Sequence, residues 1–243
     1  MTFDISSKFV KYQDPTLRTL SIIVSCEICA KIARSFNRNV YIIPQGMDSD
    51  KFSVTLDKKP GGFRKNIFMS GRVGDPTKGS QVLKEACRKL WPKRKDFVVT
   101  VTSGYKTSEP FITDITDESF IKPVEWLSQE VLPQLYGEAD ICVFPSVWPE
   151  PFGRVAVAAM AAGKPVITSR IGGLKDIVVD GKTGFLVKPG DADELAEKIN
   201  ILLDSPKLRD SMGKNGRERA ERLYNWDRII KKYYLSLFSN NRR

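Results

Sequence analysis

The sequence predicts an α/β fold: a Rossmann-like, open parallel sheet with helices on both faces. Short apolar runs rich in β-branched residues, such as 164–169, alternate with longer amphipathic stretches, such as 191–205. This alternation is typical of parallel strands joined by crossover helices. The composition, with 41% hydrophobic and 28% charged residues, is that of an ordinary globular protein. A length of 243 residues allows one large domain or one and a half smaller ones.

The expected elements follow the chain in order. We expect strands at 20–25, 39–44, 66–72, 96–104, 140–146 and 164–169, the first of them buried. Helices are expected at 26–36, 79–91, 124–139, 155–163, 191–205, 206–224 and 225–238. The stretch 181–191 is a hairpin-like segment or a short strand, and 105–120 is a polar loop.

The bulk composition restricts the compartment and the chemistry. No apolar run reaches the roughly 18 residues that span a bilayer, and the first 20 residues are too polar for a signal peptide, so we expect a cytoplasmic protein. The chain contains no histidine, which excludes a histidine base of its own and a histidine-containing zinc site. Cys26 and Cys29 form a CxxC pair, for which helix packing is the favoured interpretation and redox chemistry the alternative. Cys87 and Cys142 lie in apolar contexts typical of a core.

The charge balance points to acidic partners. The formal net charge is +10, which favours nucleotide phosphates or anionic lipid headgroups. The basic residues are spread along the chain and form no nucleic-acid-binding motif, so nucleic acid is not expected as a partner.

The loop SGRVGDPTKGS (70–80) follows a predicted strand and carries two cations, Arg72 and Lys78. Gly71, Gly74 and Gly79 leave its backbone open to close approach. Lys78 and Gly79 precede a predicted helix, whose first N–H groups favour anions. The loop is therefore a candidate phosphate cradle, with a solvated basic loop as the alternative.

The stretch FPSVWPEPFG (144–153) places a single carboxylate, Glu150, before a helix of small apolar residues. Phe152 and Gly153 begin that helix, so their N–H groups should face the carboxyl ends of the strands. Glu150 either accepts hydrogen bonds from a polyol above this helix end or acts as a simple charge partner of the helix.

Two further loops complete the predicted crevice. Gly172 and Gly173 follow the strand 164–169 and offer backbone donors or form a plain tight turn, and a fourth loop surrounds Gly104. Ligands of open α/β sheets bind outside the carboxyl ends of the strands. Two cations, two helix N-termini and one carboxylate at that edge indicate a site for a diphosphate that carries a sugar.

Several motifs resemble one family. The segments SGRVGDPTKG, YGEADICVFPSVWPEPFG, AAGKPVITSRIGGLKDIVVDGKTGFLVKPGD and YNWDRIIKKYY resemble the donor-binding, C-terminal half of the retaining GT-B-fold glycosyltransferases of family 4 (glycosyl transferases group 1). The segment 22–52 resembles the end of that family's N-terminal domain. The resemblance runs from about residue 20 to the C-terminus and implies one half of a GT-B fold.

The resemblance also implies residue roles. Arg72 and Lys78 match the basic pair that holds the donor's diphosphate, which implies electrostatic catalysis without a metal or cofactor. Glu150 matches the first acid of the E-x7-E motif, which contacts the transferred sugar. The remaining implied substrate-binding positions are Gly71, Val124, Phe152, Gly153, Arg154, Gly172 and Gly173; Val124 and its neighbour Pro123 match the segment that grips the base.

The chain departs from the family's pattern at two places. The second acid of E-x7-E, which binds the ribose, is replaced by Ala158, a loss of roughly 1.5–3 kcal/mol of donor binding without compensation. Asp176 stands where the family usually has Glu, a milder change. Residues 1–45 resemble a remnant of the family's acceptor-binding N-terminal domain, and most of that domain is absent from the sequence.

The resemblance divides the chain into four parts. Residues 1–45 are the N-terminal remnant, 46–65 a linker, 66–223 the nucleotide-sugar-binding domain and 224–243 a C-terminal crossover helix. The expected function is retaining transfer of a hexosyl group from a UDP-, GDP- or ADP-sugar to a glycan, lipid-linked or small-molecule acceptor. An acceptor-binding half would come from a partner chain or a second copy, or residues 1–45 would suffice as a minimal version of it. Peripheral membrane contact is expected if the acceptor is a lipid-linked glycan. The alternatives are a non-catalytic nucleotide-sugar-binding or regulatory module, or another GT-B enzyme such as an epimerase or a phosphorylase.

Overall fold

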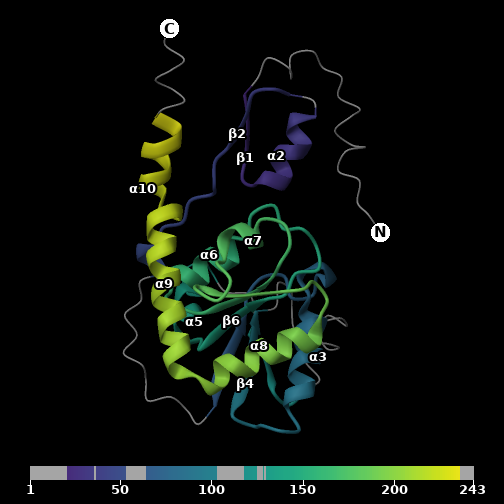
Figure 1. Cartoon of the computed structure of the whole chain (residues 1–243). Helices are drawn as coiled ribbons and strands as arrows, with labels where there is room; N and C mark the ends of the chain where they lie inside the picture. The colour runs from purple at the N-terminus through teal and green to yellow at the C-terminus, as the bar shows by residue number, and fades with distance from the viewer. Residues whose placement is uncertain are drawn as a thin grey trace.

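The computed structural model describes residues 21–35, 37–52, 64–102, 118–124, 128 and 130–235. Its main feature is a six-stranded, wholly parallel sheet (Figure 1). The strands lie in the order β5 (Ile121–Val124), β4 (Phe97–Thr102), β3 (Lys65–Met69), β6 (Ile141–Phe144), β7 (Val166–Ser169) and β8 (Gly184–Val187). The predicted fold class, an α/β fold with a parallel sheet flanked by helices, is thus confirmed.

Helices cover both faces of this sheet. On one face, α3 (Ser80–Leu90) and α8 (Ala192–Asp204) share a core cluster with Ile67, Val99 and Ile141. On the other face, a second cluster joins α5 (Leu132–Glu138), α6 (Arg154–Ala161), α7 (Leu174–Ile177) and α9 (Pro206–Tyr224). Strands β6 and β7 are buried along their whole length, which explains the continuous apolar sequence of β6. Strand β7 ends in two polar residues, Thr168 and Ser169, which are buried as well.

The small side chains of α6 follow from its position. The helix lies between the sheet and α9, and residues 156–161 are all buried. Because the helix contacts a neighbour on each side, short side chains let both neighbours approach closely. The run of alanines therefore has a packing explanation that is independent of any ligand.

A small unit precedes the sheet along the chain. Strands β1 (Ile22–Val24) and β2 (Val40–Ile42) pair in parallel, with α2 (Glu27–Arg34) between them. The prediction that 20–25 contains a buried strand is wrong for the residues the structure describes, because Ile23 in β1 is 46% exposed. Tyr41 in β2 is 41% exposed as well. Within the described residues, β1 pairs with β2 alone, so too little structure surrounds this unit to bury both of its faces.

The segment after β2 packs against the C-terminal helices. Met47 N–H donates to Tyr224 O (2.6 Å). A Cβ added to Gly46 would lie 2.1 Å from the Trp226 ring, so the two residues are in close contact. The short helix η2 (Asp50–Phe52) follows. Beyond α9, the chain continues through α10 (Trp226–Ile229) and the π-helix η4 (Ile230–Tyr234), which extend toward the same end as the β1–β2 unit (Figure 1).

Two expectations about individual elements need correction. Residues 121–124 form the edge strand β5, and the helix α5, Leu132–Glu138, covers only the second half of the helix expected at 124–139. Strand β3 ends at Met69, which places 70–72 in a loop. Segment 181–191 contains a short strand, β8, that pairs in parallel with β7, which confirms the short-strand alternative for this segment. Gly104 and most of the expected loop 105–120 lie outside the described residues.

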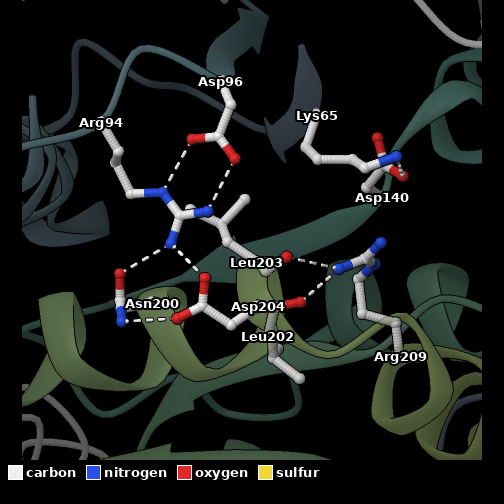
Figure 2. A network of polar contacts seen from close by, with 9 residues as sticks. All are labelled: Lys65, Arg94, Asp96, Asp140, Asn200, Leu202, Leu203, Asp204 and Arg209. Atoms are coloured by element: carbon white, nitrogen blue, oxygen red, sulfur yellow. Dashed lines mark hydrogen bonds and ion pairs between the residues drawn. The ribbon is translucent and has the colours of Figure 1, made fainter. Parts of the chain in front are cut away.

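A polar network closes the amino-terminal edge of the sheet (Figure 2). The Arg94 guanidinium donates to both carboxylate oxygens of Asp96, each at 2.7 Å. It also donates to Asn200 Oδ1 (2.8 Å) and Asp204 Oδ1 (2.7 Å) on α8. Nearby, Arg209 donates to the last carbonyls of α8, including Leu203 O (3.0 Å). The network fixes α8 to the turn that precedes β4.

Candidate active site

A cavity of about 290 Å³ opens at the carboxyl ends of β3 and β6. From β3, the strands β4 and β5 are added toward one edge of the sheet, and β6, β7 and β8 are added toward the other edge. The order of the strands therefore switches between β3 and β6. Ligands of doubly wound sheets bind at this kind of switch point. The cavity is lined by Gln45, Met69, Ser70, Gly71, Lys78, Phe144, Ser146, Glu150, Pro151, Phe152, Gly153, Arg154, Val155 and Leu174.

Lys78 reaches the cavity from the short helix η3 (Pro76–Lys78), which follows the β3 loop. Asp75 caps this helix by accepting from Thr77 N–H (3.0 Å). Gly79 has φ +75°, and a Cβ there would lie 1.9 Å from Pro145 O. A glycine is therefore required where the β3 loop crosses the β6 loop, and this crossing brings Lys78 into the cavity.

Glu150 lies opposite and forms an ion pair with Lys78 through Nζ and Oε1. The two side chains are 25% and 18% exposed, respectively. Ser146 Oγ lies 3.2 Å from the same carboxylate oxygen and 2.9 Å from Thr77 O, and its single hydroxyl hydrogen is shared between these two acceptors. The site thus places one cation and one anion side by side on two loops that Ser146 connects.

The glycine pair supports the Glu150 loop from behind. Gly173 N–H donates to Glu150 O (2.7 Å), so this N–H is already used within the protein. A Cβ at Gly172 would lie 2.4 Å from Glu150 O, and that close approach explains the glycine. Neither glycine lines the cavity, although both are buried beneath it. The structure therefore places Gly172 and Gly173 where they support the Glu150 loop, and not where their N–H groups face the cavity.

The N-terminus of α6 borders the cavity. Gly153 is its N-cap residue, and no side chain caps the helix there. Gly153 and Arg154 line the cavity, so the first N–H groups of α6 are available near the Lys78–Glu150 pair. Phe152 also lines it but is only 5% exposed, because its ring packs edge-to-face on Tyr224 (centroids 5.7 Å apart).

Arg72 lies outside the cavity lining. Its side chain is 60% exposed and pairs with Asp75 at 3.5 Å. Partial burial tends to raise the pKa of Asp75, but hydrogen bonds from Thr77 and two nearby cations lower it below its usual 3.8. The two predicted cations therefore differ: Lys78 faces the cavity, and Arg72 stands at its margin.

Two other predicted positions lie away from the cavity lining. Val124 ends the edge strand β5, beside Thr102 of β4. Ala158 is 4% exposed and lies one helical turn beyond Arg154 and Val155, which do line the cavity. Residues three and four positions apart share a helix face, so the methyl group of Ala158 lies on the side of α6 that meets the cavity.

Sequence reasoning missed three polar residues of the cavity: Gln45, Ser70 and Ser146. Ser70 Oγ hydrogen-bonds the hydroxyl of Tyr136, and burial raises the pKa of this tyrosine well above its usual value. Neutral polar residues carry no signal of their own in a single sequence. For Ser146, the signal that was present is its place directly after a buried strand, four residues before Glu150.

The cysteines show no sign of reactivity. Burial and the neighbouring Cys26 raise the pKa of Cys29 to about 11, which keeps its thiol protonated at neutral pH. Cys87 and Cys142 are buried, as expected. Across the described ranges, no group of three or more acidic or cysteine side chains is arranged to hold a metal ion. Among the helices of those ranges, none has the length and apolar character needed to cross a membrane.

The decisive comparison is with a protein family model. The model described as "Glycosyl transferases group 1" matches residues 54–219, more than half of the chain. The chain belongs to this glycosyltransferase family. Glu150, Lys78 and the whole sheet fall within the matched range.

Relatives of this glycosyltransferase agree with the assignment. A curated MMP alpha-(1->4)-mannosyltransferase of Mycolicibacterium hassiacum is 32% identical over 225 residues, 91% of this chain and 53% of that one. The structure of sucrose-phosphate synthase from Thermosynechococcus elongatus superposes with a TM-score of 0.77 and 30% identity, over 90% of this chain and 59% of that one.

A third similarity concerns the fold alone. The Anabaena protein HepE, solved with UDP-glucose, superposes with a TM-score of 0.76 at 22% identity, over 90% of this chain and 64% of that one. The chain spans about half the length of the curated mannosyltransferase it matches. The neighbours are GT-B glycosyltransferases, and the predicted membership in the glycosyltransferase group is confirmed.

Proposed function

We propose that the cavity binds a nucleotide-diphosphate sugar and that the chain supplies the donor site of a retaining, family 4 hexosyltransferase. One observation carries the proposal: Lys78, Glu150 and the uncapped N-terminus of α6 meet at the switch point of the sheet. A diphosphate needs cations and N–H donors, and a sugar needs a carboxylate that accepts from its hydroxyls. These groups are present in one cavity.

The proposed roles follow from this geometry. Lys78 and the first N–H groups of α6 hold the diphosphate and stabilise the charge that develops on it as the sugar leaves. Glu150 accepts hydrogen bonds from the sugar. Arg72 contributes long-range attraction from the cavity margin. This electrostatic stabilisation needs no metal ion, so we propose a metal-independent reaction.

The acceptor would meet the donor from the side of the β1–β2 unit. Ser25 Oγ donates to Pro151 O (3.2 Å), and Gln45 lines the cavity, so this unit borders the donor site. Ile23, Ile28 and Tyr41 expose apolar surface on it. We propose that an acceptor-binding half, carried by whichever polypeptide provides it, packs on this unit and closes the site. The domain boundaries given above remain predictions.

Calorimetry against UDP, GDP, ADP and their glucose or mannose derivatives tests the donor site. We expect one nucleotide family to bind and its sugar derivative to bind at least as well. Sugar release and transfer are then followed with and without candidate acceptor halves, and the anomeric configuration of the product tests retention. A chain that binds none of these compounds would contradict the proposal.

The alternative is a non-catalytic nucleotide-sugar-binding or regulatory module. Ala158 favours it, because this residue leaves the ribose without the carboxylate that the family pattern supplies. Binding of a nucleotide sugar without turnover, under every combination of acceptor and partner chain, would support the module over the enzyme.

We also propose that the protein contacts membranes peripherally, in the cytoplasm, where a lipid-linked acceptor would lie. The net charge of +10 supports this, since basic proteins are attracted to anionic lipid surfaces. Sedimentation with vesicles that contain 0% or about 30% anionic lipid provides the test. Binding that does not depend on the anionic fraction would contradict it.

A further inference from the structure

The Lys78–Glu150 ion pair lies inside the cavity assigned above to a nucleotide sugar. We propose that this pair lets the site discriminate between a nucleoside diphosphate that still carries its sugar and one that has lost it. Glu150 competes with the free nucleotide for Lys78, and this competition favours release of the nucleotide after transfer. The inference rests on the proposed function and deepens it.

The geometry makes the competition direct. Lys78 Nζ contacts Glu150 Oε1, and both side chains are less than one-third exposed. Ser146 Oγ, 3.2 Å from the same oxygen, helps to orient the carboxylate toward Lys78. A phosphate oxygen bound by Lys78 would therefore approach a fixed negative charge. Either the carboxylate turns away from Lys78, or it stays and repels the phosphate.

A sugar-bearing nucleotide resolves this conflict. Its hydroxyl groups donate hydrogen bonds to Glu150 and replace the contact with Lys78, so the carboxylate stays satisfied while Lys78 turns to the diphosphate. The ion pair is exchanged for two new interactions, one at each partner. Binding of the whole donor therefore includes little penalty for opening the pair.

A free nucleoside diphosphate has no group to offer Glu150. Opening the pair then leaves a half-buried carboxylate with weakened hydrogen bonding beside added negative charge. The penalty applies to the product and not to the donor. A pair outside the cavity has no such effect: Arg217 and Glu221 form an i,i+4 pair along α9, with 39% and 44% of their side chains exposed.

Glu150→Gln is the central test, because it keeps the shape of the side chain and removes the charge. Dissociation constants are measured by calorimetry for UDP, GDP and ADP and for UDP-glucose, GDP-mannose and ADP-glucose. We expect E150Q to bind the preferred free diphosphate about three- to tenfold more tightly than wild type. It should bind the sugar derivative no more tightly, or more weakly, so the preference for the donor falls.

Two further variants isolate the pair. Glu221→Gln removes the same charge far from the cavity, and it should leave every dissociation constant unchanged. Lys78→Met weakens diphosphate binding by itself. In that background, most of the gain in affinity from E150Q should be lost. Thermal unfolding of each variant confirms that it is folded before binding is measured.

The outcomes separate this inference from the proposed function. If wild type binds neither the diphosphates nor their sugar derivatives, both fail. If wild type binds them but E150Q does not tighten the free diphosphate, the competition fails and the donor site stands. A gain that persists in full in the Lys78→Met background would assign the effect to charge removal alone and would also overturn the competition.

Discussion

The two edges of the sheet use similar charged groups in opposite ways. At the amino-terminal edge, Arg94 makes four hydrogen bonds to Asp96, Asn200 and Asp204, and its side chain is only 16% exposed (Figure 2). At the carboxyl edge, Lys78 faces a cavity beside one carboxylate, and Arg72 is 60% exposed. The first edge uses its cation to hold the fold. The second leaves its cations within reach of a ligand.

The largest expected effect is a loss of stability on substitution of Arg94 at the amino-terminal edge of the sheet. Arg94→Met removes all four hydrogen bonds and takes away the cation that joins Asp96 to Asp204. We expect a loss of about 2–3 kcal/mol in the free energy of unfolding, measured by urea denaturation. Nucleotide affinity of the folded fraction should stay as in wild type, and a parallel loss of affinity would contradict the separation of the two edges.

The reverse pattern is expected for Lys78→Met. Nucleoside diphosphate affinity should fall about 30-fold, since a charge-assisted contact contributes about 2 kcal/mol. The free energy of unfolding should change by less than about 1 kcal/mol, because an ion pair that remains partly solvated stabilises the fold little. Urea denaturation and calorimetry on the same preparation check both values.

Ala158→Glu should increase nucleotide affinity at the carboxyl edge of the sheet. Ala158 is 4% exposed, so the longer side chain must displace close neighbours of α6, and thermal unfolding first shows whether the variant is folded. In the folded variant the carboxylate lies on the cavity side of α6, and we expect ribonucleoside diphosphates to bind about tenfold more tightly. The same diphosphates with 2′,3′-dideoxyribose provide the matched control, since they lack the hydroxyls that the carboxylate would accept from. An equal gain for the dideoxy compounds would mean that the new side chain acts in some other way.

Arg72→Ala should have a smaller effect. The exposed guanidinium at the cavity margin attracts the diphosphate through solvent, so affinity for a nucleotide and its sugar derivative should fall together by about two- to fourfold at low salt. At 0.5 M salt the difference should nearly vanish. No change for either ligand at low salt would remove Arg72 from the site.

The smallest effect concerns pH. The pKa of Asp75 is lower in the folded chain than its usual 3.8, so its carboxylate stabilises the fold above that value. This stabilisation is lost as the pH falls through the folded pKa. Asp75→Asn should therefore cost stability at pH 6 and progressively less below about pH 4. A stability difference that stays constant from pH 6 to pH 3 would contradict the assignment.

The sequence predicted the sheet well where its strands are central. Strand β6 has a continuous apolar sequence because both of its faces are buried, and β7 begins with two β-branched apolar residues. Strand β5 was missed because it contains Pro123, which an edge strand tolerates and a central strand does not. The exposure of Ile23 was missed because an apolar run indicates a strand but does not show whether other elements cover that strand.

For the site, charge and glycine spacing predicted Lys78, Glu150 and the start of α6 at one edge. They did not predict that Lys78 and Glu150 pair with each other, because that contact depends on the crossing of two loops at Gly79 and Pro145. The support that Gly173 gives to Glu150 is likewise a property of the folded loops. The roles of all these residues in binding remain predictions.

The contact between Met47 and Tyr224 has a mechanical consequence. The chain passes from the β1–β2 unit toward the sheet near Gly46 and from α9 into α10 near Asn225, and the two passages are bound side by side. A rotation of the β1–β2 unit must bend both passages together at this point. Any movement of that unit relative to the sheet therefore has to strain or break the contact of Met47 with Tyr224 and Asn225.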